Sequence, residues 1–168
     1  MGEVARLKPP APLAEGHDFS DFCSGEPSLD DWIKRRALAN QVGGASRTYV
    51  VCIDQRVIGY YALASGAITV ESAPGRFRRN MPHPIPVAVL GRLAVDRQWK
   101  AQGIGRALFR DAAHRVAHAA NAIGIRGIVV HAISEEAKSF YLALGFEPSP
   151  TESMTLMVAL SDVMAVLS

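Results

Sequence analysis

The chain has 168 residues, 49% hydrophobic and 20% charged, and this balance predicts one globular domain over residues 1–168. Its two cysteines, Cys23 and Cys52, are too few for a disulfide framework and indicate a reducing compartment. The first residues lack the apolar core of a signal peptide, and no apolar run is long enough to cross a membrane. We therefore expect a cytoplasmic protein that does not contact a membrane.

Positive charge is concentrated in the middle of the chain, although the formal net charge is only +2. Residues 34–110 carry 13 basic and 3 acidic side chains, a net charge of +10, whereas residues 1–33 carry −5 and residues 111–168 carry −3. Clustered cationic charge is typical of proteins that bind a polyanion, and the phosphates of a small cofactor require only a few cations. A polyanionic partner is therefore expected.

In chain order, the sequence predicts strands that alternate with helices, which favours a mixed α/β sheet. An extended, proline-containing lead-in over residues 1–16 includes a first strand around Val4–Leu7. Ser28 is expected to cap a helix that Gly43 and Gly44 terminate. Strands are predicted at residues 49–53, 57–64, 87–95, 125–133 and 154–160, helices at 104–123 and 135–144, and a short apolar tail at 163–167. Residues 73–86, with four prolines, are expected to form an ordered loop without regular structure.

The strand at residues 87–95 leads into a glycine turn, and this turn opens the next helix. The first amides of a helix lack intrahelical partners and lie at the positive end of its dipole, so they attract anions. Gly103 and Gly105 have no Cβ atoms, which lets a pyrophosphate approach these amides. A P-loop would need Gly-Lys-Ser/Thr, and a dinucleotide fingerprint would need a third glycine and a later acidic residue, and the chain has neither. A plain strand-to-helix turn is the alternative interpretation.

The run Lys100-Ala101-Gln102-Gly103-Ile104-Gly105 resembles the Gln/Arg-x-x-Gly-x-Gly/Ala loop of the GNAT N-acetyltransferases, with a lysine at its first position. The later run Phe140-Tyr141-x-x-Leu144-Gly145-Phe146 is similar to a signature of the same family. The resemblance implies a single-domain GNAT fold, with a mixed, mostly antiparallel central sheet flanked by helices, and acetyl-CoA as the cosubstrate. It places the acetyl-CoA site at the backbone of Leu93, Ala94 and Val95, beside the pantetheine arm, and at Lys100, Ala101, Gln102, Gly103, Ile104, Gly105 and Arg106 around the pyrophosphate.

Six sequence blocks, in this order, resemble the acetyltransferase toxins of the TacT and AtaT type: residues 21–32, 45–48, 59–63, 78–86, 90–96 and 145–150. This resemblance implies a toxin of a type II toxin–antitoxin system that acetylates the α-amino group of aminoacyl-tRNA and blocks translation. It also implies restraint by a ribbon-helix-helix antitoxin, contact with operator DNA through that antitoxin, and a homodimer.

Tyr141 is the candidate catalytic residue, because the resemblance implies that it lies near the CoA sulfur and protonates the leaving thiolate. A tyrosine that only packs on the core is the alternative. The family's strand amide near Leu93 would polarise the thioester carbonyl. No general base is evident, and the amine of an aminoacyl ester has a useful neutral fraction near pH 7 without one. His131, on an apolar strand, is interpreted as a core histidine rather than a proton relay, and no metal site is expected.

Seven arginines are candidates for binding tRNA phosphates, which would supply affinity and salt dependence rather than sequence choice. They are Arg35, Arg36, Arg47, Arg76, Arg78, Arg79 and Arg92. For any one of them a solvated surface charge is the alternative. Two other functions also stay open: an acetyltransferase of protein or small-molecule amines, and a non-catalytic acyl-CoA-binding or DNA-binding regulatory module.

Overall fold

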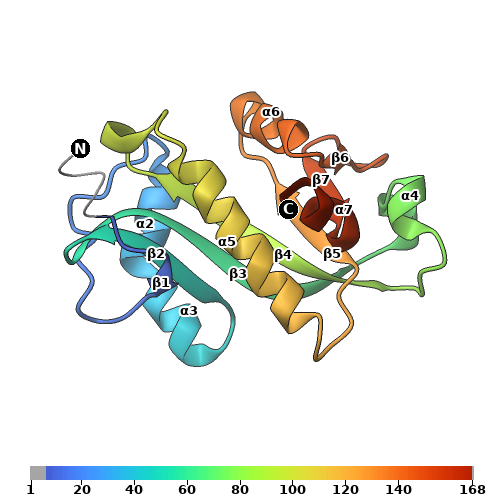
Figure 1. Ribbon diagram of the computed structural model, residues 1–168, viewed down its shortest axis with the longest axis horizontal. Helices are drawn as coiled ribbons and strands as arrows, with labels where there is room; N and C mark the ends of the chain where they lie inside the picture. Colours follow the sequence, from blue (N-terminus) through green and yellow to red (C-terminus); the bar gives the residue numbers. More distant parts are fainter. Residues whose placement is uncertain (1–6, 168) are drawn as a thin grey trace. The chain divides into compact units, whose positions relative to one another are not determined.

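The computed structural model describes residues 7–167 (Figure 1). Its seven-stranded sheet has the order β1 (Ala11–Pro12), β2 (Arg47–Ile53), β3 (Arg56–Ile68), β4 (Ile85–Val95), β5 (Gly127–His131), β7 (Thr155–Ala159) and β6 (Glu147–Pro148). Strands β4 and β5 pair in parallel, whereas the pairs β1–β2, β2–β3, β5–β7 and β6–β7 are antiparallel. The expected mixed, mostly antiparallel sheet is confirmed.

The helices are α2 (Pro27–Arg35), α3 (Ala37–Gly43), α4 (Gly75–Arg78), α5 (Ile104–Ala119), α6 (Glu135–Ala143) and α7 (Leu160–Leu167), with 3-10 turns η1 (Val70–Ser72) and η2 (Arg97–Trp99). Within residues 7–167, none of them is long and apolar enough to cross a membrane. The chain divides into two compact units. The first comprises Met1–Ala64 and Arg92–Ala112, and the second comprises Ser65–Gly91 and Ala113–Ser168. That residues 1–168 form one domain stays a prediction.

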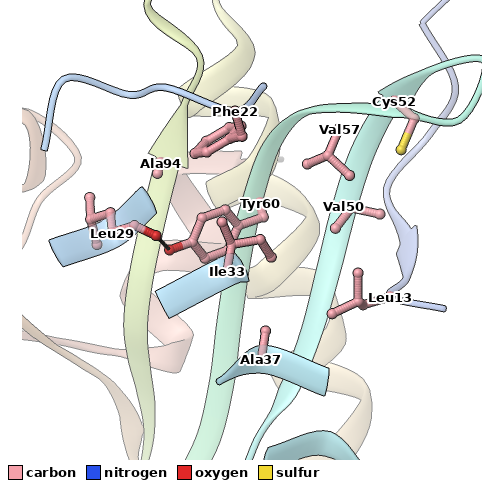
Figure 2. Close-up of a cluster of buried hydrophobic side chains, with 10 residues drawn as sticks. All are labelled: Leu13, Phe22, Leu29, Ile33, Ala37, Val50, Cys52, Val57, Tyr60 and Ala94. Atoms are coloured by element: carbon pink, nitrogen blue, oxygen red, sulfur yellow. Dashed lines mark hydrogen bonds between the residues drawn. The ribbon is translucent and has the colours of Figure 1, made fainter. Parts of the chain in front are cut away.

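In the first unit, helices α2 and α3 pack on one face of β2 and β3 (Figure 2). Val50 and Tyr60 are register partners, so both side chains point to this face. The fully buried Tyr60 donates its hydroxyl to the carbonyl oxygen of Leu29 at 2.7 Å, which ties α2 to the sheet. The buried cluster consists of Leu13, Phe22, Leu29, Ile33, Ala37, Val50, Cys52, Val57, Tyr60 and Ala94.

The opposite face of the same strands packs against the first half of α5. A Cβ atom at Gly59 would come within 3.1 Å of the Cδ1 atom of Leu108, so only glycine fits this approach without a shift. The neighbouring Tyr61 is fully buried and donates its hydroxyl to the Asp111 carboxylate at 2.5 Å. These contacts hold α5, and with it the turn that precedes α5, against β3.

The core of the second unit surrounds the buried side chain of Phe77 in α4. Its buried cluster consists of Ala73, Phe77, Ile85, Val87, Val129, Met157 and Ala159. Gly127, the first residue of β5, permits this packing, because a Cβ atom there would lie 2.1 Å from the Val158 carbonyl oxygen and 2.7 Å from the ring of Phe77. The short helix α4 is therefore anchored through its single aromatic side chain.

The predicted helix from Ser28 to Gly43 is two helices. Pro27 lies in the first turn of α2 with Glu26 at the N-cap, and Arg36 (φ −120°, ψ −31°) separates α2 from α3. The prediction of Ser28 as the cap is wrong, because the helix begins at Pro27, two residues earlier than a cap at Ser28 implies. Gly44 ends α3 with a left-handed φ of +82°, as expected.

The structure also bears on the expectations for residues 73–86, for the end of α5 and for the first strand. Residues 73–86 do contain regular structure, because Pro74 acts as the N-cap residue of α4 instead of interrupting it. Helix α5 ends at Ala119, so Ile123 lies beyond it and is 60% exposed. Of the predicted strand around Val4–Leu7, residues 4–6 lie outside the described residues, and Leu7 forms an isolated antiparallel bridge with Ile53.

We expect Gly127→Ala to destabilise the protein, because the added methyl group would overlap a backbone carbonyl oxygen that cannot rotate away. Overpacking of this kind lowers the free energy of unfolding by about 1–3 kcal/mol. Gly124→Ala is the control, since a Cβ atom at Gly124 meets nothing within 4 Å. Equal free energies of unfolding for the two variants in urea titrations would contradict the close approach at Gly127.

Candidate functional site

The residues predicted to bind acetyl-CoA lie in the first unit, from the end of β4 through η2 to the first turn of α5. Asp96, which is 3% exposed, follows β4 directly, and its carboxylate accepts hydrogen bonds from the N–H groups of Gln98 (3.0 Å) and Cys23 (3.1 Å). The N–H of Arg97 donates to the carbonyl oxygen of Cys23 at 2.9 Å. Asp96, which the sequence analysis missed, thus fixes the path of the chain between the strand and the glycine turn.

The glycine turn has the backbone geometry of an anion site. Ala101 and Gly103 have positive φ angles of 63° and 80°, and α5 begins at Ile104. The N–H of Ala107 donates to the carbonyl oxygen of Gly103 at 3.1 Å, so the N–H groups of residues 104–106 precede the first intrahelical bond. A Cβ atom at Gly103 would meet nothing within 4 Å, so the turn is open on the side where a side chain would project.

The charged and exposed side chains around this turn also suit a pyrophosphate. Lys100, Gln102 and Arg106 are exposed, whereas Ile104 is buried and anchors the turn to the core. Two cations therefore flank a set of unpaired amides at the positive end of α5. The residues present fit the diphosphate of acetyl-CoA.

Tyr141 lies in the second unit, on α6, whose N-terminus is capped by the Ser134 hydroxyl. Its ring makes edge-on contacts with Phe140 and Phe146, at centroid distances of 5.1 and 5.2 Å. The residue is 7% exposed, and burial raises the pKa of its hydroxyl. This hydroxyl makes no hydrogen bond with any residue from 7 to 167. Tyr141 is thus held in its protonated form with its donor capacity unused.

His131 is not the core histidine that its apolar strand suggested. It is the last residue of β5 and is exposed, and its Nδ1 atom lies 3.0 Å from the Thr155 hydroxyl. The continuous buried run of the strand ends one residue earlier, at Val130.

Among the arginines of the second unit, Arg76 already has an anionic partner within the protein. It makes a bidentate ion pair with Asp162, at 3.0 Å from Nε and 2.8 Å from Nη2, and this pair raises the pKa of Arg76. Arg126 donates to the carbonyl oxygens of Arg76 and Phe77, each at 2.8 Å. Sequence reasoning missed Asp162 and Arg126, which fix α4 in place.

Arg78 and Arg79 lie at the end of this fixed helix, and both are exposed. They remain candidates for a phosphate contact, whereas Arg76 is better described as a residue that positions them. Of the other four candidates, all in the first unit, Arg35 and Arg36 are exposed at the end of α2. Arg47 donates to the Gln41 carbonyl oxygen at 3.1 Å, and the half-buried Arg92 lies over the ring of Trp32.

A family model described as acetyltransferase (GNAT) domain matches residues 44–148. The chain belongs to the GNAT acetyltransferases. This membership confirms the fold expected from the sequence and the expected enzyme class, an acetyl-CoA-dependent N-acetyltransferase. The chain is also similar to a tRNA-acetylating toxin of Mycobacterium tuberculosis, with 51% identity over 158 residues that cover 94% of this chain and 95% of that toxin.

Two solved structures of the toxin AtaT have the same fold. AtaT complexed with acetyl-methionyl-tRNAfMet has a TM-score of 0.88 and 28% sequence identity, covering 96% of this chain and 99% of the AtaT chain. A mutant AtaT bound to the C-terminus of the antitoxin AtaR and to acetyl-CoA has a TM-score of 0.82 and 28% identity, covering 95% of this chain and 97% of the AtaT chain. The resemblance to acetyltransferase toxins is therefore confirmed.

We expect Gly103→Val to abolish acetyl-CoA binding measured by calorimetry, because valine disfavours a φ of +80° and its side chain fills the space beside the amides. Gly44→Val is the matched control: Gly44 has a φ of +82° and equally open surroundings, but it terminates α3. It imposes comparable backbone strain away from the turn. Unchanged affinity in Gly103→Val would exclude the turn as the pyrophosphate site.

Proposed function

We propose that this GNAT acetyltransferase is a toxin that transfers the acetyl group of acetyl-CoA to the α-amino group of aminoacyl-tRNA and so blocks translation. The likeness to the tRNA-acetylating toxin, which extends over nearly the whole of both chains, carries the proposal. The concentration of positive charge in residues 34–110 supports a polyanionic acceptor over a small amine.

The first unit binds the acetyl donor. Acetyl-CoA supplies an acetyl group activated as a thioester. The amides of residues 104–106, with Lys100 and Arg106, hold its diphosphate, as helix N-termini hold other anions. The backbone of Leu93, Ala94 and Val95 takes the pantetheine arm, and the amide near Leu93 polarises the thioester carbonyl.

Tyr141 gives its proton to the departing CoA thiolate. Because burial raises its pKa, the hydroxyl stays protonated throughout the neutral and mildly alkaline range, as a general acid must. The aromatic contacts with Phe140 and Phe146 fix the direction of the ring. The acceptor amine needs no dedicated base, since an α-amino group has an ordinary pKa of about 8 and an ester lowers it further.

Charged tRNA is held through its phosphates by exposed arginines. Arg78 and Arg79 contribute from α4, and Arg35, Arg36 and Arg47 contribute from the first unit. Arg76 acts through its pair with Asp162, which keeps α4 in place.

An antitoxin restrains the enzyme, as the complex of AtaT with AtaR suggests for a related chain. A ribbon-helix-helix antitoxin, operator DNA bound through it, a homodimeric toxin and a cytoplasmic location are part of the same proposal. Acetylation assays decide between this function and its alternatives: purified protein is incubated with labelled acetyl-CoA and either charged tRNA, peptides or small amines. Failure to label any charged tRNA would overturn the proposal.

We expect Tyr141→Phe to bind acetyl-CoA normally but to acetylate charged tRNA about 10²–10⁴-fold more slowly, the contribution of a positioned proton donor. Phe140→Leu is the control, because it removes a ring contact of Tyr141 and leaves the hydroxyl. Full activity of Tyr141→Phe in single-turnover assays would show that the thiolate leaves without this proton. If Phe140→Leu slowed acetylation as much as Tyr141→Phe does, the role of Tyr141 would be packing and not proton donation.

We expect the double variant Arg78→Ala, Arg79→Ala to use charged tRNA less well and with a weaker dependence on salt. Each lost phosphate contact reduces the slope of log K against log [salt] by about 0.7–0.9. The double variant Lys8→Ala, Arg110→Ala removes two exposed charges outside the candidate site and serves as the control. Equal salt slopes for the wild type and the Arg78/Arg79 variant would remove these arginines from the tRNA site.

A further inference from the structure

Three side chains of the first unit form a stack that ends in Arg92. The rings of Tyr60 and Trp32 are nearly parallel, with an interplanar angle of 12° and a centroid distance of 6.0 Å. The guanidinium carbon of Arg92 lies 4.8 Å from the centroid of the Trp32 ring. Tyr60 is fixed by complete burial and by its bond to Leu29, so the whole stack rests on the core shown in Figure 2.

Arg92 has no hydrogen-bonding partner in spite of this fixed position. Its Nε atom is buried and unpaired, and the side chain makes no hydrogen bond or ion pair with any residue from 7 to 167. A partly desolvated guanidinium without an anion is unfavourable, and the contact with Trp32 offsets only part of this cost. An anionic ligand that pairs with Arg92 would therefore gain from a cation that is already oriented and partly dehydrated.

The position of Arg92 along β4 indicates which part of a ligand it meets. Arg92 directly precedes Leu93, whose amide is assigned to the thioester carbonyl, and one strand residue spans only about 3.3 Å. Neighbouring side chains on a strand point to opposite faces, so Arg92 and Ala94 point toward α2 while Leu93 and Val95 point away from it. Arg92 thus lies beside the point of acetyl transfer.

We propose that Arg92 binds the 5′-phosphate of the terminal adenosine of aminoacyl-tRNA, with Trp32 and Tyr60 as the residues that position it. The inference rests on the proposed function. In this substrate the terminal 5′-phosphate is the negative charge nearest the reactive amine, and the planar guanidinium fork matches a phosphate in a bidentate way. Arg92 therefore places the charged end of the acceptor, whereas Arg78 and Arg79 bind phosphates elsewhere on the tRNA.

The experiment uses two minimal acceptors, 3′-aminoacyl-adenosine and the same compound with a 5′-phosphate. We expect the wild type to prefer the phosphorylated acceptor by about 10–100-fold in kcat/KM, the gain of hydrogen bonds to a charged group, chiefly through KM. Arg92→Gln, which keeps a planar polar group but no charge, removes this preference. Arg92→Lys keeps the charge without the planar fork, and it retains a small part of the preference for the phosphorylated acceptor. The Arg78→Ala, Arg79→Ala double variant retains the full preference.

Trp32→Leu tests the positioning role, because it keeps the Arg92 charge but removes the ring that orients it. We expect the phosphate preference of Trp32→Leu to lie between those of the wild type and Arg92→Gln. For every variant, an unchanged affinity for acetyl-CoA shows that the protein is folded. The inference would be overturned if the wild type showed no preference for the phosphorylated acceptor, or if Arg92→Gln kept that preference. In either case, acetylation of charged tRNA would still support the proposed function. Absence of acetylation on charged tRNA would overturn the function itself.

Discussion

One buried carboxylate, that of Asp96, connects the parts of the first unit on which the candidate site depends. Its two oxygens accept hydrogen bonds from the N–H groups of Cys23 and Gln98. A buried carboxylate is tolerated only where such bonds replace its lost hydration, so the segment before α2 and the start of η2 must both stay close to the end of β4. The glycine turn that follows η2 and the helix that carries Trp32 are thereby attached to the same strand.

The arginines show that a formal count of positive charge overstates the charge available to a ligand. Arg76 and Asp162 neutralise each other, and Arg126 uses its donors on the carbonyl oxygens of Arg76 and Phe77. These bonds stabilise a helix of one turn, which would not persist by propensity alone. Arg78 and Arg79, exposed at the end of this helix, are thereby held in place by contacts that Arg76 and Arg126 make.

Local signals explain what the sequence predicted correctly. The glycine turn, the start of α5 at Ile104 and the position of Tyr141 on α6 are each determined within a few residues. By contrast, the partners of Arg76 lie 86 and 50 residues away, at Asp162 and Arg126, and no local pattern predicts such pairs. His131 was misjudged for a related reason, because periodicity does not reveal where a strand leaves the core. The stack under Arg92 likewise joins α2, β3 and β4, and only the structure reveals it.

A site that offers a proton donor and no dedicated base selects among amines by their own acidity. A lysine side chain has an ordinary pKa of about 10.4, and an α-amino group one of about 7.7–8.0, so their neutral fractions at pH 7 differ by roughly a few hundredfold. With Tyr141 in the proposed role of general acid, such an enzyme would acetylate an α-amine far more readily than a lysine of equal access. The 5′-phosphate contact proposed for Arg92 would then distinguish among α-amines, because neither a free amino acid nor a protein N-terminus carries a nucleotide phosphate. With these proposed roles, acidity and charge together would favour an α-amine attached to a nucleotide.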